Sequence, residues 1–290
     1  MKLWGSRIKT DIDEARSETG IKKKNSGWTG IRTPVSTGLK IILGIIPVFL
    51  LFLIWVLLTA GEAESRVISP VILPSPFEVV MSFKTLWFEA ELVRSLIAST
   101  WRIVLGFLCG VLVSLPLGLL MGSFSRVRAL FDPVTVFLAY LPIPALVPLT
   151  MSLFGIDEFQ KVMFLALAFV IYLLPLILKA VEDVDNVFLQ TAYTMGASRW
   201  QTVRRVLLPI AFPRIIDIMR LGFAVGWSYI VLVEMVAAER GLGQIIIVAQ
   251  RRGPREHIYL VILVIVLVAY ITDKLWTRLS RYLFPYLEAK

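Results

Sequence analysis

The chain has 290 residues, of which 57% are hydrophobic and only 18% are charged. A soluble core cannot bury so large an apolar share, so the composition excludes an ordinary soluble domain and indicates a membrane protein. The single cysteine excludes an internal disulfide framework and the single histidine excludes a histidine-based metal cluster within one copy, so we expect no metal site. The net charge of +9 is spread over a tail, loops and helix ends. That spread fits contact with membrane lipid and the positive-inside rule, and it argues against a nucleic-acid partner.

Six apolar segments follow the N-terminal tail, at 41–59, 96–121, 129–153, 162–179, 215–238 and 258–272. A helix needs about 20 residues to cross a hydrocarbon core of about 30 Å. The run "LVILVIVLVAY" (Leu260–Tyr270) does not alternate apolar and polar residues as a barrel strand does. We therefore predict an all-α membrane protein with about six transmembrane helices.

Lysine and arginine in short loops indicate the orientation of the spans. The tail carries nine basic residues against four acidic ones, whereas the stretch after the first span is rich in glutamate. Both termini are therefore predicted to be cytoplasmic, in the inner or plasma membrane of the cell. The predicted organisation is a cytoplasmic basic tail at 1–40, a retained anchor helix at 41–59, an external loop at 60–90, a core at 91–281 and a C-terminal tail at 282–290.

A polar and basic stretch, "QTAYTMGASRWQTVRRVLLP", lies between the fourth and fifth segments. Apolar residues at helical spacing lead to Gly196, where a backbone with positive φ is least costly, and Ser198 can cap a second short helix. Pro209 marks where the chain enters the next span. The spacing predicts an elbow of two short cytoplasmic helices at 189–209, here called the elbow. An interfacial helix resting on lipid is the alternative.

The elbow resembles the cytoplasmic signature of permease subunits in binding-protein-dependent ABC importers, which reads E-A-A, three residues, G, nine residues, I-x-L-P. The spacing is kept throughout, with Gln in place of Glu, Thr in place of the first Ala and Val in place of Ile. The matching residues are Gln190, Thr191, Ala192, Gly196, Val206, Leu208 and Pro209.

Three further segments resemble the nitrate, sulfonate, taurine and bicarbonate branch of these permeases, over about 91–281: "SLIASTWRIVLGFLCGVLVSLPLGLLMG", "LPIPALVPLTMSLFGIDEFQK" and "VLVEMVAAERGLGQII". The resemblance implies the type I ABC importer permease fold and import of a small oxyanion. It also implies three partners, namely a second permease copy in a homodimer, cytoplasmic ATPase subunits and an extracytoplasmic substrate-binding protein. By resemblance, the surface that couples to the ATPase comprises Gln190, Thr191, Ala192, Gly196, Ser198, Arg199, Arg204, Arg205 and Pro209.

The sequence contains no G-x-x-x-x-G-K-[ST] phosphate loop and no constellation of catalytic side chains. We therefore expect a transport subunit without catalytic residues or cofactors of its own, with ATP and Mg bound by a separate ATPase chain. A secondary transporter or a membrane scaffold that is not coupled to ATP is the alternative. Neither explains the spacing of the elbow, and the chain has no internal repeat of the kind common in secondary transporters.

Three prolines crowd the third apolar segment, at Pro142, Pro144 and Pro148. Each removes a backbone donor, so this segment cannot form an unbroken helix. Irregular backbone at membrane depth is tolerated where it is buried in protein or lines a cavity. The prolines are therefore candidates for lining the transport pathway, and a kinked helix that packs on its neighbours is the alternative.

Two charged residues lie within apolar segments, where charge is costly. Arg102 is expected near the outer end of the second span, where its side chain reaches lipid headgroups or contacts an anion. Glu234 is expected near the outer end of the fifth span, where it pairs with Arg240 or with an arginine of a neighbouring chain. Both are candidate pathway or gate residues.

Small residues four apart recur in the second span, as Gly106 with Gly110 and Gly118 with Gly122. This spacing allows close approach of two helices. Together with the resemblance, it suggests a homodimer with the pathway at its two-fold interface.

A basic cluster, formed by Arg251, Arg252 and Arg255, surrounds a Gly-Pro turn in a loop predicted to be external. Positive charge is usually sparse on that side. The cluster is a candidate contact for the substrate-binding protein, or it draws an oxyanion toward the dimer mouth. The alternatives are headgroup binding and pairing with Glu239 and Glu256.

Overall fold

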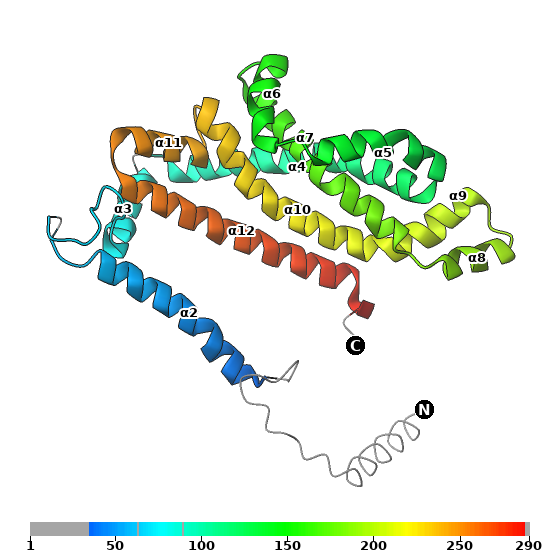
Figure 1. Ribbon diagram of the computed structural model, residues 1–290, viewed down its shortest axis with the longest axis horizontal. Coiled ribbons are helices and arrows are strands. Elements are labelled where there is room, and N and C mark those ends of the chain that lie inside the picture. The colour runs from blue at the N-terminus through cyan, green and yellow to red at the C-terminus, as the bar shows by residue number, and fades with distance from the viewer. Residues whose placement is uncertain (1–34, 63, 89, 288–290) are drawn as a thin grey trace, which may run out of the picture. The chain divides into compact units, whose positions relative to one another are not determined.

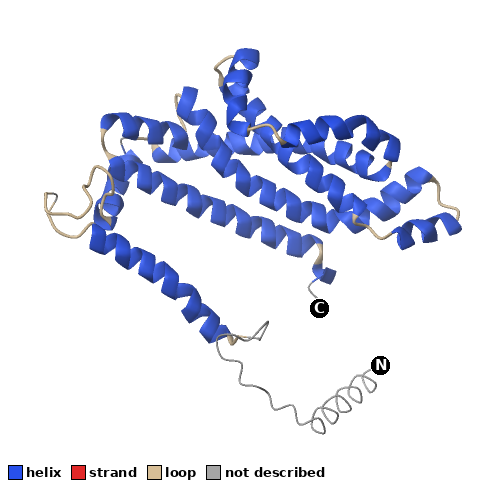
Figure 2. Cartoon of the chain, in the orientation of Figure 1, coloured by secondary structure: helices blue, strands red, loops and turns tan. Residues whose placement is uncertain are grey.

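The computed structural model describes residues 35–62, 64–88 and 90–287. The basic tail up to residue 34 and the last three residues lie outside the described part. All the elements described are helical (Figures 1 and 2). In chain order they are α2 (Thr37–Leu58), α3 (Pro76–Phe88), α4 (Leu92–Ser123), α5 (Ser125–Ala139), η1 (Ile143–Ala145), α6 (Leu146–Phe154), α7 (Glu158–Glu182), α8 (Asn186–Thr194), α9 (Arg199–Thr202), η2 (Val203–Leu207), α10 (Leu208–Ala237), α11 (Leu242–Arg252), α12 (Arg255–Leu283) and η3 (Pro285–Leu287).

The helix α2 belongs to a unit that ends at Leu57, and the chain from Leu58 onward forms a second unit. The 22 residues of α2 extend over about 33 Å at 1.5 Å per residue, which is enough to cross a bilayer core. None of its residues is buried, and its apolar side chains occur all around the helix. A helix of this kind suits an environment of lipid, as predicted for the first span.

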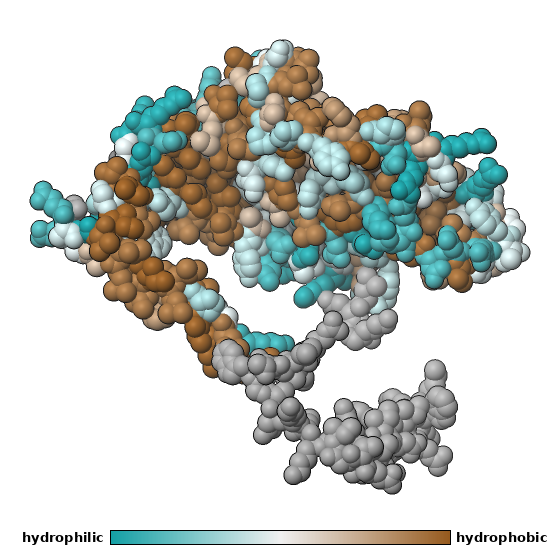
Figure 3. Space-filling model, in the orientation of Figure 1, coloured by the Kyte–Doolittle hydropathy of each residue, from teal (hydrophilic) through white to brown (hydrophobic). Residues whose placement is uncertain are grey.

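Four long helices, α4, α7, α10 and α12, form the body of the second unit. The α4 helix packs along α7, and α10 contacts α4, α7 and α12. Figure 1 shows α11 at one end of these helices and α8 with α9 at the other, here called the α11 end and the elbow end. Hydrophobic residues cover much of the visible side of this unit, and hydrophilic residues gather toward both ends (Figure 3).

The glycines of α4 allow this helix to pack closely against another helix of the same chain. A Cβ atom added to Gly106 would lie 2.5 Å from Cβ of Leu165, and one added to Gly110 would lie 2.6 Å from Cβ of Phe169, both on α7. Gly118 and Gly122 face α7 in the same way. The close approach that these glycines predict is real, but its partner is α7 of the same chain. The spacing therefore carries no argument for a dimer.

The third span is broken. The pair formed by α5 and η1–α6 bends by 90° at residues 140–142, so the described residues contain five helices long and apolar enough to span a membrane, or six spans if this pair counts as one. Pro142 precedes η1, Pro144 lies within it and Pro148 lies in α6. The prediction that this segment cannot be one unbroken helix is confirmed.

The segment predicted as a loop at 60–90 contains the 13-residue helix α3. Its start is fixed by a capping box, in which the Ser75 amide donates to the Glu78 carboxylate at 2.7 Å and the Glu78 amide donates to the Ser75 hydroxyl at 3.3 Å. Arg66 pairs with Glu78 at 2.9 Å. The hydrogen bond from Arg66 holds the pKa of Glu78 below its usual range. The S-x-x-E spacing could have revealed this helix from the sequence.

Candidate functional site

The turn of the elbow is made by local hydrogen bonds at the end of α8. The Ala197 amide donates to the Ala192 carbonyl and the Gly196 amide donates to the Tyr193 carbonyl, each at 3.0 Å, which is a Schellman turn. Gly196 has a φ of +81°, a conformation that is costly for a residue with a Cβ atom. The predicted break at Gly196 is confirmed.

The start of α9 is fixed by a second local motif. The Gln201 amide donates to the Ser198 hydroxyl at 3.3 Å, and the Ser198 amide donates to the Gln201 side chain at 2.8 Å. Ser198 is therefore the N-cap, as predicted. The prediction of a separate second short helix is wrong, because α9 continues through the π-helical turn η2 into α10, and Arg199–Val236 forms one span.

Pro209 gives the physical reason for this continuity. Proline has no amide hydrogen, and its ring clashes with the carbonyl group four residues earlier, here that of Arg205. A π-turn at this place widens the backbone and lets the helix continue past the proline. The elbow consequently has a single reversal, at Gly196, and the chain enters its span without leaving the helix.

The elbow exposes large apolar side chains. Val187, Phe188, Tyr193, Met195 and Trp200 are between 50% and 83% exposed. Ala192 is buried, whereas the other residues of the predicted coupling surface are exposed, namely Gln190, Thr191, Gly196, Ser198, Arg199, Arg204, Arg205 and Pro209. Exposed apolar side chains rimmed by polar and basic ones are typical of an interaction surface.

A groove of about 570 Å³ separates the elbow from the connection between α4 and α5. Leu189, Tyr193 and Val203 line it from the elbow, and its basic lining residues are Arg126 and Arg199. The groove therefore lies at the elbow end of the helical body.

At the α11 end, Arg102 of α4 joins two carboxylates from other helices. It donates to Glu234 of α10 at 2.6 Å and to both carboxylate oxygens of Glu158, the first residue of α7, at 2.5 and 2.7 Å. It also donates to the main-chain carbonyl of Arg240 at 2.7 Å. Arg102 is 4% exposed and Glu234 is 0% exposed. Two opposite charges are thus buried together, which is the condition under which burial of charge is tolerated.

Glu234 is also held by α4 and by the first turn of α11. The Ser99 hydroxyl donates to its carboxylate at 2.8 Å, and the Gly243 amide donates to it at 2.9 Å. Gly241 has a φ of +143°, and a Cβ atom there would lie 2.5 Å from Oε2 of Glu234. One carboxylate therefore ties α4, α10 and α11 together. The residues Ser99, Arg102, Glu158, Lys161 and Glu234 are here called the ion cluster.

The structure corrects the sequence-based interpretation of these charges. Arg102 does not reach headgroups or a free anion, because it is buried against two carboxylates. Glu234 pairs with Arg102 of the same chain, and not with Arg240. Arg240 instead lies 3.8 Å from Glu91. The partner of Glu234 is 132 residues away in the sequence, and local spacing cannot find a contact of that range.

Sequence reasoning missed Ser99, Glu158 and Lys161. Lys161 donates to Glu158 at 3.1 Å, so the outer carboxylate of the ion cluster has two cationic neighbours. An acidic residue at the start of a helix is common, because it complements the helix dipole. The sequence therefore did not distinguish Glu158 from an ordinary helix-start residue. Ser99 and Arg102 did carry a signal, since polar residues three apart in an apolar span share one helix face.

The prolines of the broken span adjoin a hollow of about 380 Å³ between α6 and α10. Pro144 and Pro148 line one side, and Leu232 and Val236 of α10 line the other. The lining is almost entirely apolar. A role of these prolines in the transport pathway stays a prediction.

The basic cluster lies where α11 ends and α12 begins, around Gly253 with a φ of +108°. The predicted turn is present, although most of the segment at 239–257 is helical. Among the residues that the structure describes, none of the three arginines pairs with Glu239 or Glu256. The Nε atom of Arg255 is buried without a hydrogen-bond partner.

Long apolar helices, a broken span and a capped elbow between two spans define a multi-pass helical membrane protein with a permease fold. The chain belongs to the family of binding-protein-dependent transport system inner membrane components, whose model matches residues 114–285. The family predicted from the elbow is thereby confirmed.

The chain is 33% identical to the taurine transport system permease protein TauC of Escherichia coli K12, over 88% of this chain and 92% of that one. It is 28% identical to the putative aliphatic sulfonates transport permease protein SsuC of Bacillus subtilis 168, over 97% of this chain and 95% of that one. Among solved structures, a permease chain of the inward-facing MetNI methionine ABC transporter superposes with a TM-score of 0.60 at 20% identity, covering 69% of this chain and 97% of that one. The predicted branch and fold are confirmed.

Proposed function

We propose that this protein is the membrane subunit of an ATP-driven importer that takes a small oxyanion from a substrate-binding protein. The observation that carries the proposal is the elbow, a capped turn that presents apolar and basic side chains at one end of the spans. ATP and Mg are bound by a partner ATPase, and the elbow is the surface on which that ATPase docks. Docking explains the exposed aromatic residues together with the polar rim, whereas a helix resting on lipid needs no reversal at Gly196.

The test of this coupling is Gly196→Val in the reconstituted complex. No atom lies within 4 Å of a Cβ atom built at Gly196, so the substitution acts only through backbone strain. We expect ATP hydrolysis to continue while uptake falls, because the turn no longer aligns α8 with α9. Gly155→Val is the matched control, since Gly155 has a φ of +82° and equally open surroundings but lies outside the elbow. Normal coupling in Gly196→Val would remove the proposed role.

The proposed orientation puts the elbow and both termini in the cytoplasm, as the basic tail favours. The α11 end then faces outward, and the basic cluster meets the substrate-binding protein or concentrates an anion near the pathway. Exposed charges are screened over about 8 Å at physiological ionic strength. Arg251→Ala combined with Arg252→Ala should therefore weaken uptake, most at low salt, with basal ATPase activity unchanged. If the uptake rate and its dependence on ionic strength are unchanged in the double variant, the basic cluster only binds lipid headgroups.

The complex is proposed to contain two copies of this chain, with the pathway between them near the hollow that Pro144 and Pro148 line. Support comes from α6, whose Leu149 and Leu153 are exposed apolar residues next to that hollow. Cysteines at these two positions, in a Cys109→Ser background, should cross-link two copies in vesicles. Cysteines at Ile42 and Ile46 of α2 serve as the control, and equal cross-linking there would contradict the specific interface.

The proposed substrate is a sulfonate or a related small oxyanion. Support comes from two relatives that match most of this chain, a taurine permease and a putative permease for aliphatic sulfonates, and from the basic cluster. The reconstituted complex with its binding protein should take up radiolabelled taurine, and unlabelled alkanesulfonates should compete. Competition by neutral amino acids alone would point to another substrate class.

A further inference from the structure

The groove at the elbow end has charged lining residues of one sign only. It lies between the elbow and the connection from α4 to α5, and Arg126 and Arg199 are its charged lining residues. Among the described residues that line it, none is acidic. Ser125 lines the groove next to Arg126, and its hydroxyl has no hydrogen-bond partner within the described part of the chain. The groove therefore offers charged and neutral donors, which suit an anionic group.

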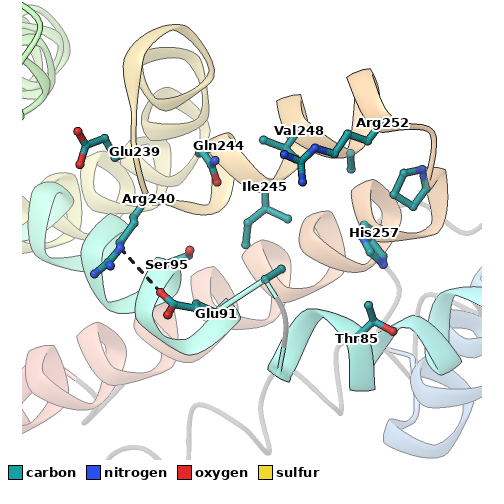
Figure 4. A pocket seen from close by; sticks show the side chains of 13 residues that line it. Thr85, Glu91, Ser95, Glu239, Arg240, Gln244, Ile245, Val248, Arg252 and His257 are labelled. Carbon is teal, nitrogen blue, oxygen red and sulfur yellow. Dashed lines mark ion pairs between the residues drawn. The ribbon is translucent and has the colours of Figure 1, made fainter.

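A hollow of about 370 Å³ at the α11 end shows the contrasting case (Figure 4). Its lining includes two glutamates and two arginines, namely Glu91, Glu239, Arg240 and Arg252. Glu91 lies 3.8 Å from Arg240 and 2.6 Å from Arg94. The carboxylates and guanidinium groups balance in that hollow, so charge alone favours neither an anion nor a cation there.

The two arginines of the groove are not neutralised by the protein. Across the residues that the structure describes, neither Arg126 nor Arg199 makes an ion pair or a side-chain hydrogen bond, and both are exposed. Arg128, two residues after Arg126, pairs with Glu182 of α7. A carboxylate is thus present at this end, but it binds an arginine that does not line the groove. The positive charge of the groove is left for a ligand outside the chain.

The sequence places the groove at a boundary of the membrane. The lining residues at 123–127 connect the apolar segments at 96–121 and 129–153. They therefore lie where the chain leaves the hydrocarbon core and enters it again. Phospholipid headgroups occupy this depth. In the proposed orientation this is the cytoplasmic leaflet, which carries anionic lipid.

The rest of the lining is largely apolar. Hydrophobic side chains line the groove from both sides, namely Phe124, Val127, Leu189, Val203 and Leu207. An inorganic anion would leave these side chains without contacts, whereas a phospholipid has an apolar body next to its phosphate. The combination of apolar lining and unpaired guanidinium groups therefore fits an anionic amphiphile.

We propose that the groove binds an anionic phospholipid, with its phosphate at Arg126 and Arg199 and its upper acyl chains along the apolar lining. Guanidinium groups suit phosphate oxygens because their planar donors match them in pairs. Arg126 belongs to the start of α5 and Arg199 to the start of α9, so the lipid joins the two sides of the groove. The proposal does not depend on ATP-driven import. A free phosphate ion has the same anionic chemistry, and the experiments separate the two sources.

The first experiment measures which lipid the full chain retains. The chain is extracted from vesicles of phosphatidylglycerol and phosphatidylcholine in equal amounts, and bound lipid is identified by native mass spectrometry. We expect phosphatidylglycerol to be retained in preference. Arg126→Gln combined with Arg199→Gln should lower its retention about ten-fold, with an unchanged melting temperature because both side chains are exposed. Equal retention of the two lipids by the unmodified chain would overturn the proposal.

Arg204→Gln combined with Arg205→Gln is the matched control. These two arginines are exposed residues of the same elbow, but they do not line the groove. The control removes the same charge as the groove variant, and we expect it to retain phosphatidylglycerol as the unmodified chain does. An equal loss in both double variants would show general attraction between basic residues and anionic membrane, and would contradict a defined site.

The second experiment separates the lipid from other anionic ligands. The full chain is titrated calorimetrically with inorganic phosphate in nanodiscs that contain phosphatidylglycerol, where we expect no saturable binding because the lipid fills the groove. Saturable phosphate binding there, lost in the groove variant, would identify a free anion and overturn the lipid assignment. In nanodiscs of phosphatidylcholine alone, a fall in recovery of the ATPase subunit caused by Arg126→Gln would assign the groove to that partner and overturn it as well.

Discussion

The two ends of the helical body differ in the side chains that are out of place there: one end buries charged residues, and the other exposes apolar ones. At the α11 end, Arg102 and Glu234 lie inside the protein, and each has a charged partner on another helix of the same chain. At the elbow end, aromatic and aliphatic residues lie outside, where the described part of the chain supplies no cover for them. The ion cluster is thus satisfied within one chain, whereas the apolar side chains of the elbow are the surface on which we propose that a partner docks. We therefore expect substitutions in the ion cluster to lower the stability of the fold, and substitutions in the elbow to weaken binding of the proposed ATPase partner.

The largest loss of stability is expected from Arg102→Met. The substitution leaves Glu234 buried without its counter-charge, and breaking a buried ion pair from one side costs about 3–5 kcal/mol. Thermal unfolding in detergent should show a marked decrease in melting temperature. Replacing both partners, as Arg102→Met with Glu234→Leu, should recover part of the loss, because no lone charge then remains. A double variant no more stable than the single one would contradict this account.

A smaller loss is expected from Gly241→Ala, which leaves every charge in place. The new Cβ atom would lie 2.5 Å from Oε2 of Glu234, so the carboxylate or the first turn of α11 must shift. Overpacking of this kind costs about 1–3 kcal/mol. Gly253→Ala is the control, because Gly253 also has positive φ but meets no atom within 4 Å. The two variants can be compared by their melting temperatures, and an equal decrease would assign the effect to φ alone.

A still smaller and pH-dependent effect is expected at the half-buried pair of Arg66 and Glu78. Because the folded pKa of Glu78 is lowered by Arg66, the pair stabilises the start of α3 above the unfolded pKa, near 4.3 for glutamate. This contribution is lost as the pH falls through the folded pKa. Hydrogen-exchange protection factors in α3 should therefore decrease on acidification. Glu78→Gln should remove this pH dependence, and an unchanged slope would exclude Glu78 as its source.

The smallest effect on stability is expected at the elbow, from Trp200→Ser or Tyr193→Ser. Both side chains are at least half exposed, and surface substitutions usually change stability by less than about 0.5 kcal/mol. Recovery of the ATPase subunit in co-purification should nevertheless fall. Tyr282→Ser is the control, since Tyr282 is also exposed but lies on α12. A marked decrease in melting temperature with unchanged recovery of the ATPase subunit would show that these side chains stabilise the fold and do not bind the partner.

The elbow could be predicted because its rules are local. A glycine at a reversal, a Ser-x-x-Gln capping box and a fixed spacing lie within 20 residues, and each motif has one structural meaning. The long apolar segments could also be predicted from local features, since length and composition suffice to identify a span. The π-turn was not predicted, because Pro209 permits either a new helix start or a continued helix, and the packing of α10 decides between them.

The ion cluster could not be predicted because its contacts are long-range. Arg102, Glu158 and Glu234 lie on three helices, and the sequence does not state which helix faces which. The same gap explains the glycines of α4. Their spacing predicts a close neighbour but not whether that neighbour is α7 or another chain.

The continuous helix from Arg199 to Val236 joins the elbow end of the helical body to its α11 end. Its 38 residues correspond to about 57 Å at 1.5 Å per residue. Glu234 lies near one tip of this rod, and the capped start of α9 lies at the other. If a partner displaces the elbow, as proposed, the same helix carries that displacement to Glu234, the carboxylate that holds the first turn of α11. One continuous helix therefore carries both the start of α9 in the elbow and Glu234 in the ion cluster.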